Sequence, residues 1–88
     1  MAVFVDDAQI PWRGWRWSHM VAESAQELHD AAEALGLGRK RAQEKGRTPH
    51  YDLPDRLREQ AIEQGIAIPI HWRALVSRRA AFAWVSGS

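Results

Sequence analysis

The segment WRWSHMV, residues 15–21, decides how the rest of the chain is arranged. Its odd positions carry Trp, Trp, His and Val, whereas its even positions carry Arg, Ser and Met. Alternation with a period of two is typical of a strand that is buried on one side. The segment therefore predicts a half-buried strand, with His19 on its apolar side.

A second strand is predicted upstream of this segment. Val3, Phe4 and Val5 form a short run of β-favouring residues, which Asp6 and Asp7 end. Open α/β sheets bind ligands at the carboxyl ends of their strands, so both aspartates are candidate site residues. An Asx turn is an equally good interpretation, because aspartate commonly ends a strand in this way.

A helix is predicted downstream, over residues 25–35. Ser24 and Glu27 have the spacing of a capping box, which satisfies unpaired amides at a helix start. Apolar residues at helical spacing form one stripe, and they place His29 on the inward side of this helix. The glycines that end it, by supplying positive backbone angles, are Gly36 and Gly38.

A second helix is predicted to begin at Pro54, because proline lacks an amide proton that a first helical turn does not use. Asp52 is then a natural cap for this helix. Helical spacing places Arg58 close to the core, and Gly65 closes the helix.

These segments predict a small α/β or α+β domain in the order strand, strand, helix, helix, strand, helix. Its three-stranded sheet is covered by two or three helices. The third strand is residues 66–70, where Pro69 favours an edge position, and the last helix is residues 71–85. Residues 1–70 are assigned to one α/β domain, and residues 71–88 to a basic C-terminal helix or tail that packs on it or on a partner.

Composition limits the class of protein. The chain has 88 residues, 45% of them hydrophobic and 26% charged, which is typical of one small folded domain. It contains no cysteine, which excludes a disulfide framework and a thiolate metal site. The amino terminus lacks the basic residues of a signal peptide, and no apolar run approaches the length of a membrane span. We therefore expect a cytoplasmic protein without a membrane partner.

Positive charge gathers in two segments, although the net charge is only +1. Residues 39–47 hold five basic residues against Glu44 alone, and the chain after Ile70 holds three arginines and no acid. Such segments attract phosphates, yet a solvated basic loop is the more common interpretation. Nucleic acid is the weaker candidate partner, because no recognised binding motif accompanies these short segments.

Polar side chains from four distant stretches are expected to meet in one pocket. The ligand-binding candidates are His19, His29, His50, Tyr51, Asp52 and Arg58. Arg58, a guanidinium on an inward helix face, requires an anion, which is either Asp52 or a bound phosphate or carboxylate. The candidates for catalysis are His50, His19 and Asp6. A divalent metal is the one cofactor that the pattern suggests, and its candidate ligands are Asp6, His19, His29 and His50. None of the spacings matches a compact metal signature.

Five ordered motifs run through most of the chain: MxVxVDD, HMxAE, ELHxxAxxLG, PHYDLxxxxR and AIxxG. They resemble the domain of unknown function 4031 family, a group of small bacterial and phage proteins, from Val3 to about Ile70. The matched positions are Asp6, His19, Glu27, Leu28, His29, Gly36, His50, Tyr51, Asp52, Arg58 and Gly65. Glu23 stands where the family usually has aspartate. The resemblance strengthens the candidate site and implies no particular reaction.

Three functions fit these features. The first is a module that binds a phosphate-bearing small ligand such as a nucleotide, with Arg58 and His50 engaging the phosphates. The second is a metal- or histidine-dependent hydrolase resembling a phosphodiesterase, in which His50 or His19 transfers protons. The third is a non-catalytic homo-oligomer that self-associates through Trp72, Trp84 and the tail. The sequence leaves open whether the protein is an enzyme.

Overall fold

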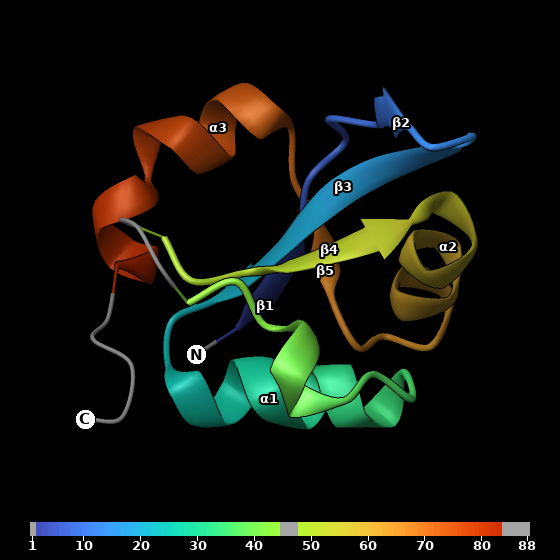
Figure 1. Ribbon diagram of the computed structural model, residues 1–88. Coiled ribbons are helices and arrows are strands. Elements are labelled where there is room, and N and C mark those ends of the chain that lie inside the picture. The colour runs from blue at the N-terminus through green and yellow to red at the C-terminus, as the bar shows by residue number, and fades with distance from the viewer. Residues whose placement is uncertain (1, 45–47, 84–88) are drawn as a thin grey trace.

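The computed structural model describes residues 2–44 and 48–83 (Figure 1). The basic residues Lys45 and Arg47, and Trp84 in the proposed self-association surface, lie outside the described residues. The described part contains a five-stranded sheet and three α-helices. The strands are β1 Val3–Val5, β2 Ile10–Trp12, β3 Trp15–Ala22, β4 Tyr51–Pro54 and β5 Ile68–Pro69. The helices are α1 Ala25–Ala34, α2 Asp55–Glu63 and α3 Trp72–Ser77, with 3₁₀ turns at Arg39–Arg41 and Arg79–Phe82.

The predicted strand at residues 15–21 is confirmed as β3, and it organises the sheet. One edge of β3 pairs antiparallel with β2 and β1 in succession, because Trp17 faces Ile10 and Met20 faces Val5. Its other edge pairs antiparallel with β4, where Met20 faces Tyr51. Strand β5 extends the sheet by pairing parallel to β1. The mixed α+β class is confirmed.

The predicted three-stranded sheet is wrong in its strand number. Strand β2 was not among the predicted strands, and it forms a tight hairpin with β3 through Arg13 and Gly14, whose φ angles are 51° and 78°. Positive φ at both turn positions matches the twist of paired strands. Strand β4 was read as a helix entry, but it pairs with β3, and Asp52 lies within it and does not cap α2. Pro54 occupies the cap position without a side-chain hydrogen bond.

The first helix follows its prediction closely. Ser24 accepts a hydrogen bond from the amide of Glu27 at 3.2 Å and donates one to the Glu27 carboxylate at 2.8 Å. Gly36 has the positive φ of a helix terminator, 78°. Gly38 does not, because its φ of −72° is ordinary extended backbone before the 3₁₀ turn. The predicted last helix is also shorter than expected, since α3 ends at Ser77 and a 3₁₀ turn follows.

The sheet separates two hydrophobic clusters. The larger cluster lies under α1 and α2, and it buries the even side of β3, including Met20 and Ala22. The smaller cluster lies under α3 and joins Val21 to Leu75 and Phe82. The odd side of β3, predicted to face the main core, therefore faces α3. Because α3 is short, it covers only part of that face (Figure 1). His19 lines a pocket together with residues of α3.

Candidate metal centre and ligand pocket

Strand register brings three polar residues into one row across the sheet. His19 lies directly opposite Asp52 in the β3–β4 pair. On the other edge of β3, the amide of Asp6 donates to the carbonyl of His19 at 2.9 Å. Directly opposed residues of antiparallel strands project to the same face. His50 precedes Asp52 by two residues and so projects to this face as well.

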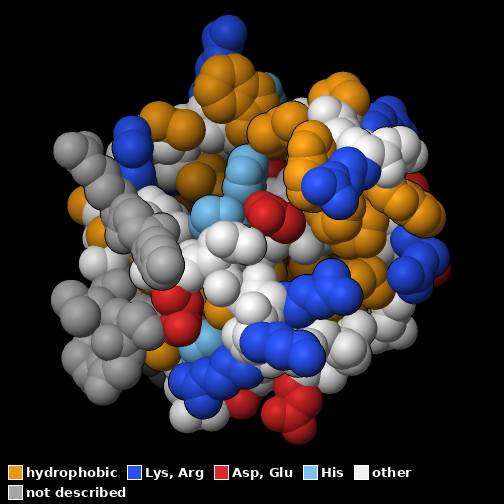
Figure 2. All heavy atoms as spheres, in the orientation of Figure 1, with side chains coloured by type: hydrophobic (Ala, Val, Ile, Leu, Met, Phe, Trp, Pro, Cys, Tyr) orange, Lys and Arg blue, Asp and Glu red, His pale blue; other side chains and the backbone are white. Residues whose placement is uncertain are grey.

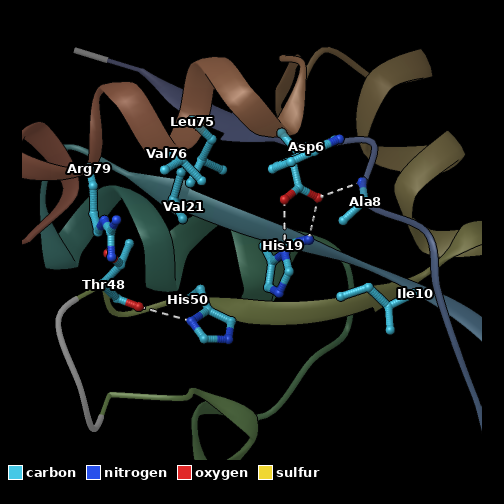
Figure 3. Close-up of a pocket in the computed structure, with 11 residues that line it drawn as sticks. Asp6, Ala8, Ile10, His19, Val21, Thr48, His50, Leu75, Val76 and Arg79 are labelled. Atoms are coloured by element: carbon cyan, nitrogen blue, oxygen red, sulfur yellow. Dashed lines mark hydrogen bonds and ion pairs between the residues drawn. The ribbon is translucent and has the colours of Figure 1, made fainter.

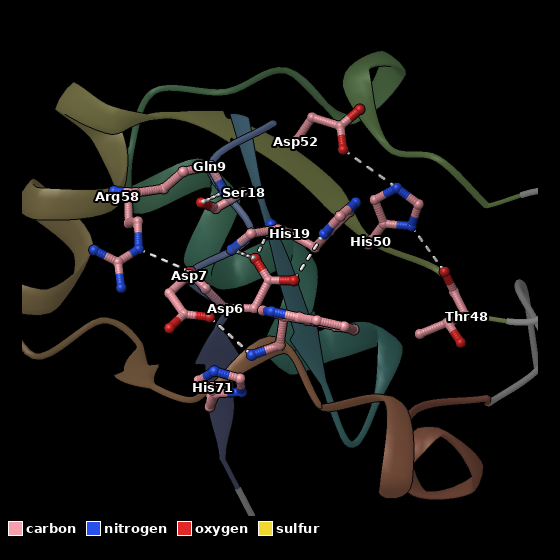
Figure 4. Close-up of polar contacts among 12 residues, drawn as sticks. Asp6, Asp7, Gln9, Ser18, His19, Thr48, His50, Asp52, Arg58 and His71 are labelled. Carbon is pink, nitrogen blue, oxygen red and sulfur yellow. Dashed lines mark hydrogen bonds and ion pairs between the residues drawn. The ribbon is translucent and has the colours of Figure 1, made fainter. Parts of the chain in front are cut away.

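Asp6 orients the ring of His19 (Figure 4). The Asp6 Oδ2 atom lies 2.8 Å from His19 Nδ1, and its Oδ1 atom accepts from the His19 amide at 2.8 Å. Oδ1 also accepts from the amide of Ala8 at 3.2 Å, so the predicted Asx turn forms as well. An ionised carboxylate only accepts hydrogen bonds, so His19 Nδ1 carries the proton in this contact and Nε2 is the ring nitrogen left for a metal.

His50 is oriented by a backbone carbonyl in the same manner. Its Nδ1 donates to the carbonyl of Thr48 at 2.9 Å, and its Nε2 lies 3.3 Å from Asp52 Oδ1. The rings of His19 and His50 meet edge to face with their centroids 5.1 Å apart. One potential ligand atom from each of His19, His50 and Asp52 lies within 4.8 Å of the others. Two imidazoles and a carboxylate are a common donor set for divalent transition metals.

Charge and burial compete in this cluster. Burial raises the pKa of the Asp6 carboxyl, but its hydrogen bonds from His19 outweigh burial and hold that pKa below its ordinary value. Burial lowers the pKa of His50, but hydrogen bonds to Asp52 and Thr48 outweigh it and raise that pKa. The hydrogen bond from His50 lowers the pKa of Asp52. Both carboxylates are therefore ionised at neutral pH, and they attract a cation, either a proton or a metal.

A pocket of about 640 Å³ opens beside the two imidazoles (Figure 3). Its polar lining residues are Asp6, His19, Thr48, His50 and Arg79. Its other lining residues are Ala8, Ile10, Val21, Trp72, Leu75 and Val76. Arg79 and Thr48 lie at one end of the pocket, and Ala8 and Ile10 at the other. A ligand would meet apolar walls, one guanidinium and the imidazole nitrogens.

Helix α3 supplies one wall of this pocket, and Asp7 tethers it. Asp7 Oδ1 accepts from the amide of Trp72, the first residue of α3, at 2.8 Å. The two adjacent aspartates therefore have different tasks. Asp6 orients a candidate ligand of the metal, whereas Asp7 positions the helix above it.

The structure does not bring His29 and Tyr51 into this site. Tyr51 is buried on the opposite face of the sheet, where its hydroxyl lies 2.7 Å from His29 Nδ1. His29 Nε2 lies 3.2 Å from a carboxylate oxygen of Glu44. These contacts join α1, β4 and the segment after the first 3₁₀ turn. They have the character of a buried structural network.

Arg58 lies beside the site without lining the pocket. Its Nε donates to the carbonyl of Asp6 at 2.8 Å, so α2 holds the loop that carries Asp6 (Figure 4). Glu23, which stands where the family usually has aspartate, accepts a hydrogen bond from the amide of Ala2 at 2.8 Å. Of the predicted site residues, the structure gathers Asp6, His19, His50 and Asp52, and it leaves His29, Tyr51 and Arg58 outside the cluster.

Sequence reasoning missed most of the pocket wall. Ile10 reaches the pocket only because residues 10–12 form strand β2. That strand was not predicted, because Pro11 is unfavourable within a strand. Trp72 reaches it because Asp7 anchors α3, a contact between residues 65 positions apart. Arg79 belongs to the basic C-terminal segment, and that concentration of charge was the only sequence signal for it.

The comparisons with known proteins bear on identity only at the level of the family. The family model described as protein of unknown function (DUF4031) matches residues 3–82. The chain belongs to the DUF4031 family. The match extends beyond Ile70, so the DUF4031 region includes α3 and the pocket wall that it forms. No curated protein and no solved structure matches the chain.

Within residues 2–44 and 48–83 of this DUF4031 chain, no helix is long and apolar enough to form a transmembrane span.

Proposed function

We propose that this protein binds a divalent transition metal through His19, His50 and Asp52 and uses it to hold a phosphate-bearing ligand in the adjacent pocket. One observation carries the proposal. Both imidazoles have Nδ1 engaged by an oxygen acceptor, which leaves each Nε2 available, and one potential ligand atom from each of His19, His50 and Asp52 lies within 4.8 Å of the others. Metal-binding histidines are commonly fixed in this way by a carboxylate or a carbonyl behind the ring.

The pocket supports an anionic ligand. Three protein ligands leave coordination positions open, and a phosphate oxygen is a suitable occupant of such a position. Arg79 lines the same pocket and offers a second contact for an anion. The apolar walls formed by Ile10, Leu75 and Val76 would accept the organic part of the molecule.

Metal binding is tested by calorimetric titration of the intact protein with Zn²⁺. We expect one site per chain, and we expect His50→Ala and Asp52→Asn each to weaken it at least about tenfold, because each removes a ligand. His71→Asn is the matched control. His71 is exposed and caps α3 through Nδ1, a role that asparagine also performs. Equal affinity in the wild type and both site variants would refute the metal site.

Ligand binding is tested separately, with the metal site loaded. Inorganic phosphate and a panel of nucleotides are added, and the shift in melting temperature is measured. We expect a stabilisation that Arg79→Ala reduces, since ligands that bind only the folded state raise its stability. If no anion shifts the melting temperature of the metal-loaded protein, the phosphate-bearing ligand is refuted, whereas the metal site is not.

Hydrolysis is the second candidate function, and the open coordination position favours it. A metal bound by three side chains commonly holds a water molecule, whose pKa it lowers. Such a water could attack a phosphoester, forming a new P–O bond as the bond to the leaving alcohol breaks. Release of 4-nitrophenol from bis(4-nitrophenyl) phosphate, measured with Zn²⁺ or Mn²⁺, tests this candidate. Activity that survives Asp52→Asn would argue against it.

A further inference from the structure

The β2–β3 hairpin carries apolar side chains on the same face of the sheet as the candidate metal centre. Trp17 and Trp15 precede His19 at intervals of two along β3, so they share its face. Ile10 faces Trp17 and Trp12 faces Trp15 in the β2–β3 register, which places them on this face too. The rings of Trp12 and Trp17 meet edge to face at 6.1 Å. We call Ile10, Trp12, Trp15 and Trp17 the tryptophan face.

This tryptophan face is open to solvent. Trp12 is 58% exposed, Trp15 is 56% exposed and Ile10 is 49% exposed. Large exposed apolar patches on a small protein mark interaction sites, since they are costly to leave in water. Figure 2 shows hydrophobic side chains gathered over β2 and α3, next to histidine and carboxylate side chains in a hollow. Ile10 belongs to both the tryptophan face and the pocket, so the two surfaces are continuous.

Cations accompany the aromatic rings. The guanidinium carbon of Arg13 lies 4.6 Å from the ring centroid of Trp12, and that of Arg73 lies 5.3 Å from the ring centroid of Trp72. Arg79 lines the pocket that Trp72 also lines. Positive charge is thus present at the hairpin tip, along α3 and inside the pocket. Aromatic rings interleaved with guanidinium groups are suited to bases and phosphates.

We propose that the tryptophan face binds single-stranded nucleic acid and that the strand continues into the pocket, where a phosphate reaches the metal. This inference rests on the proposed function and names the ligand class for the same site. Unpaired bases offer aromatic faces that stack on exposed tryptophan regardless of sequence, whereas bases inside a duplex do not. The seven residues of β3 from Trp15 to Val21 extend about 20 Å, which gives room for several nucleotides.

A second copy of this chain is a poorer occupant of the tryptophan face. Self-association through one patch usually places that patch against itself. Arg13, Arg73 and Arg79 would then approach the same cations of the partner, and juxtaposed like charges disfavour association. A polyanion is attracted by the same three residues.

The test is fluorescence anisotropy with a fluorescein-labelled oligothymidine of about ten nucleotides, within the usual range for single-strand binding modules. The intact protein is titrated at low salt, with Zn²⁺ and with a chelator in parallel. We expect Trp12→Ala and Trp15→Ala each to weaken binding at least about fivefold. Arg13→Ala should weaken it and reduce its dependence on salt. Ile68→Ala is the control, because Ile68 is 53% exposed and lies on β5, at the other end of the strand order.

The outcomes separate this inference from the metal proposal. Tryptophan variants that bind Zn²⁺ normally but have lost the oligonucleotide would support the inference. Absence of oligonucleotide binding by a protein that binds Zn²⁺ would overturn it and leave the metal site intact. Preference for a duplex of equal length would also overturn it. So would self-association in analytical ultracentrifugation that Trp12→Ala and Trp15→Ala abolish, if no oligonucleotide binds.

Discussion

At the scale of single residues, the proposed metal site depends on which nitrogen of His19 holds the proton. The Asp6 carboxylate accepts from Nδ1 and so leaves Nε2 as the free donor atom. In Asp6→Asn, an amide group directed at Nδ1 would favour the tautomer with the proton on Nε2. We expect Zn²⁺ affinity to fall about 10- to 100-fold, as for other residues that orient metal ligands.

Long-range ¹⁵N–¹H spectra of the histidine rings measure this change directly, because the two neutral tautomers have different nitrogen shifts. Asp7→Asn is the matched control. Its remaining carbonyl oxygen still accepts from the amide of Trp72, so α3 should stay in place. If Asp6→Asn binds Zn²⁺ as well as Asp7→Asn does, the carboxylate does not orient His19 for a metal.

Tyr51 offers a second prediction, because it is the only tyrosine in the chain. Burial raises its pKa above the ordinary value, and the nearby Glu44 adds to this whereas Arg39 opposes it. Below about pH 10 the phenol is neutral in both the folded and the unfolded chain. Above that pH the unfolded chain releases the proton first, so stability should fall as pH rises through the folded pKa.

Tyrosinate absorbance near 295 nm reports this residue alone against the tryptophan background. We expect a midpoint above about 10 in the folded protein. Urea unfolding across the same pH range should lose stability in the wild type and lose less in Tyr51→Phe. A midpoint at or below the value for free tyrosine would show that the hydroxyl is exposed.

At the scale of elements, α2 acts on the site through one hydrogen bond. Arg58 Nε donates to the carbonyl of Asp6, across 52 positions of sequence. We expect Arg58→Ala to lower the free energy of unfolding by about 1.5 to 3 kcal/mol, the range for a hydrogen bond that involves a charged group. Zn²⁺ affinity should fall as well, because Asp6 loses its anchor. Arg56→Ala on the exposed side of the same helix is the control, and equal behaviour of the two variants would contradict this role.

The elements that the sequence predicted well are those defined by local rules. Helix α1 combines a cap at Ser24 with an apolar stripe and a terminal glycine, and each of these acts within a few residues. Strand β4 was missed because the local preference of Pro54 for a helix start competed with pairing to β3, and pairing prevailed. Tertiary contacts of that kind are not encoded in any short window of sequence.

The same limit applies to the candidate site. His19, His50 and Asp52 were each selected as unusual polar residues in their own segments. Their grouping depends on the register between β3 and β4, since a shift of one residue would send Asp52 to the opposite face. The same register keeps His29 out of the candidate site. Tyr51 precedes Asp52 in β4 and therefore projects to the opposite face of the sheet, where its hydroxyl contacts His29.

At the scale of the whole molecule, helices cover the two faces of the sheet unequally. Helices α1 and α2 cover the first face, whereas α3 and the 3₁₀ turn after it cover part of the second. The pocket and the tryptophan face occupy what α3 leaves open. The pocket therefore depends on a C-terminal segment that the sequence assigned to a basic helix or tail packing on the α/β domain or on a partner.

Phe82 tests whether that segment belongs to the folded domain. It is fully buried in the smaller hydrophobic cluster, and its ring centroid lies 5.6 Å from that of Phe4 in β1. Removal of a buried aromatic ring typically costs about 3 to 5 kcal/mol, so Phe82→Ala should unfold at much lower urea concentration. Phe82→Leu keeps most of the volume and should cost less, which provides a variant that remains folded.

Val76→Ala is the matched control, because Val76 lies on α3 but is 47% exposed. If residues 71–83 fold as one unit with the sheet, Phe82→Leu should shift a single cooperative transition seen by both tryptophan fluorescence and circular dichroism. Small domains that unfold in one step give coincident curves for different probes. A transition unchanged by either Phe82 variant would mean that α3 docks too weakly to wall the pocket, and the metal centre would then lie on an open sheet face.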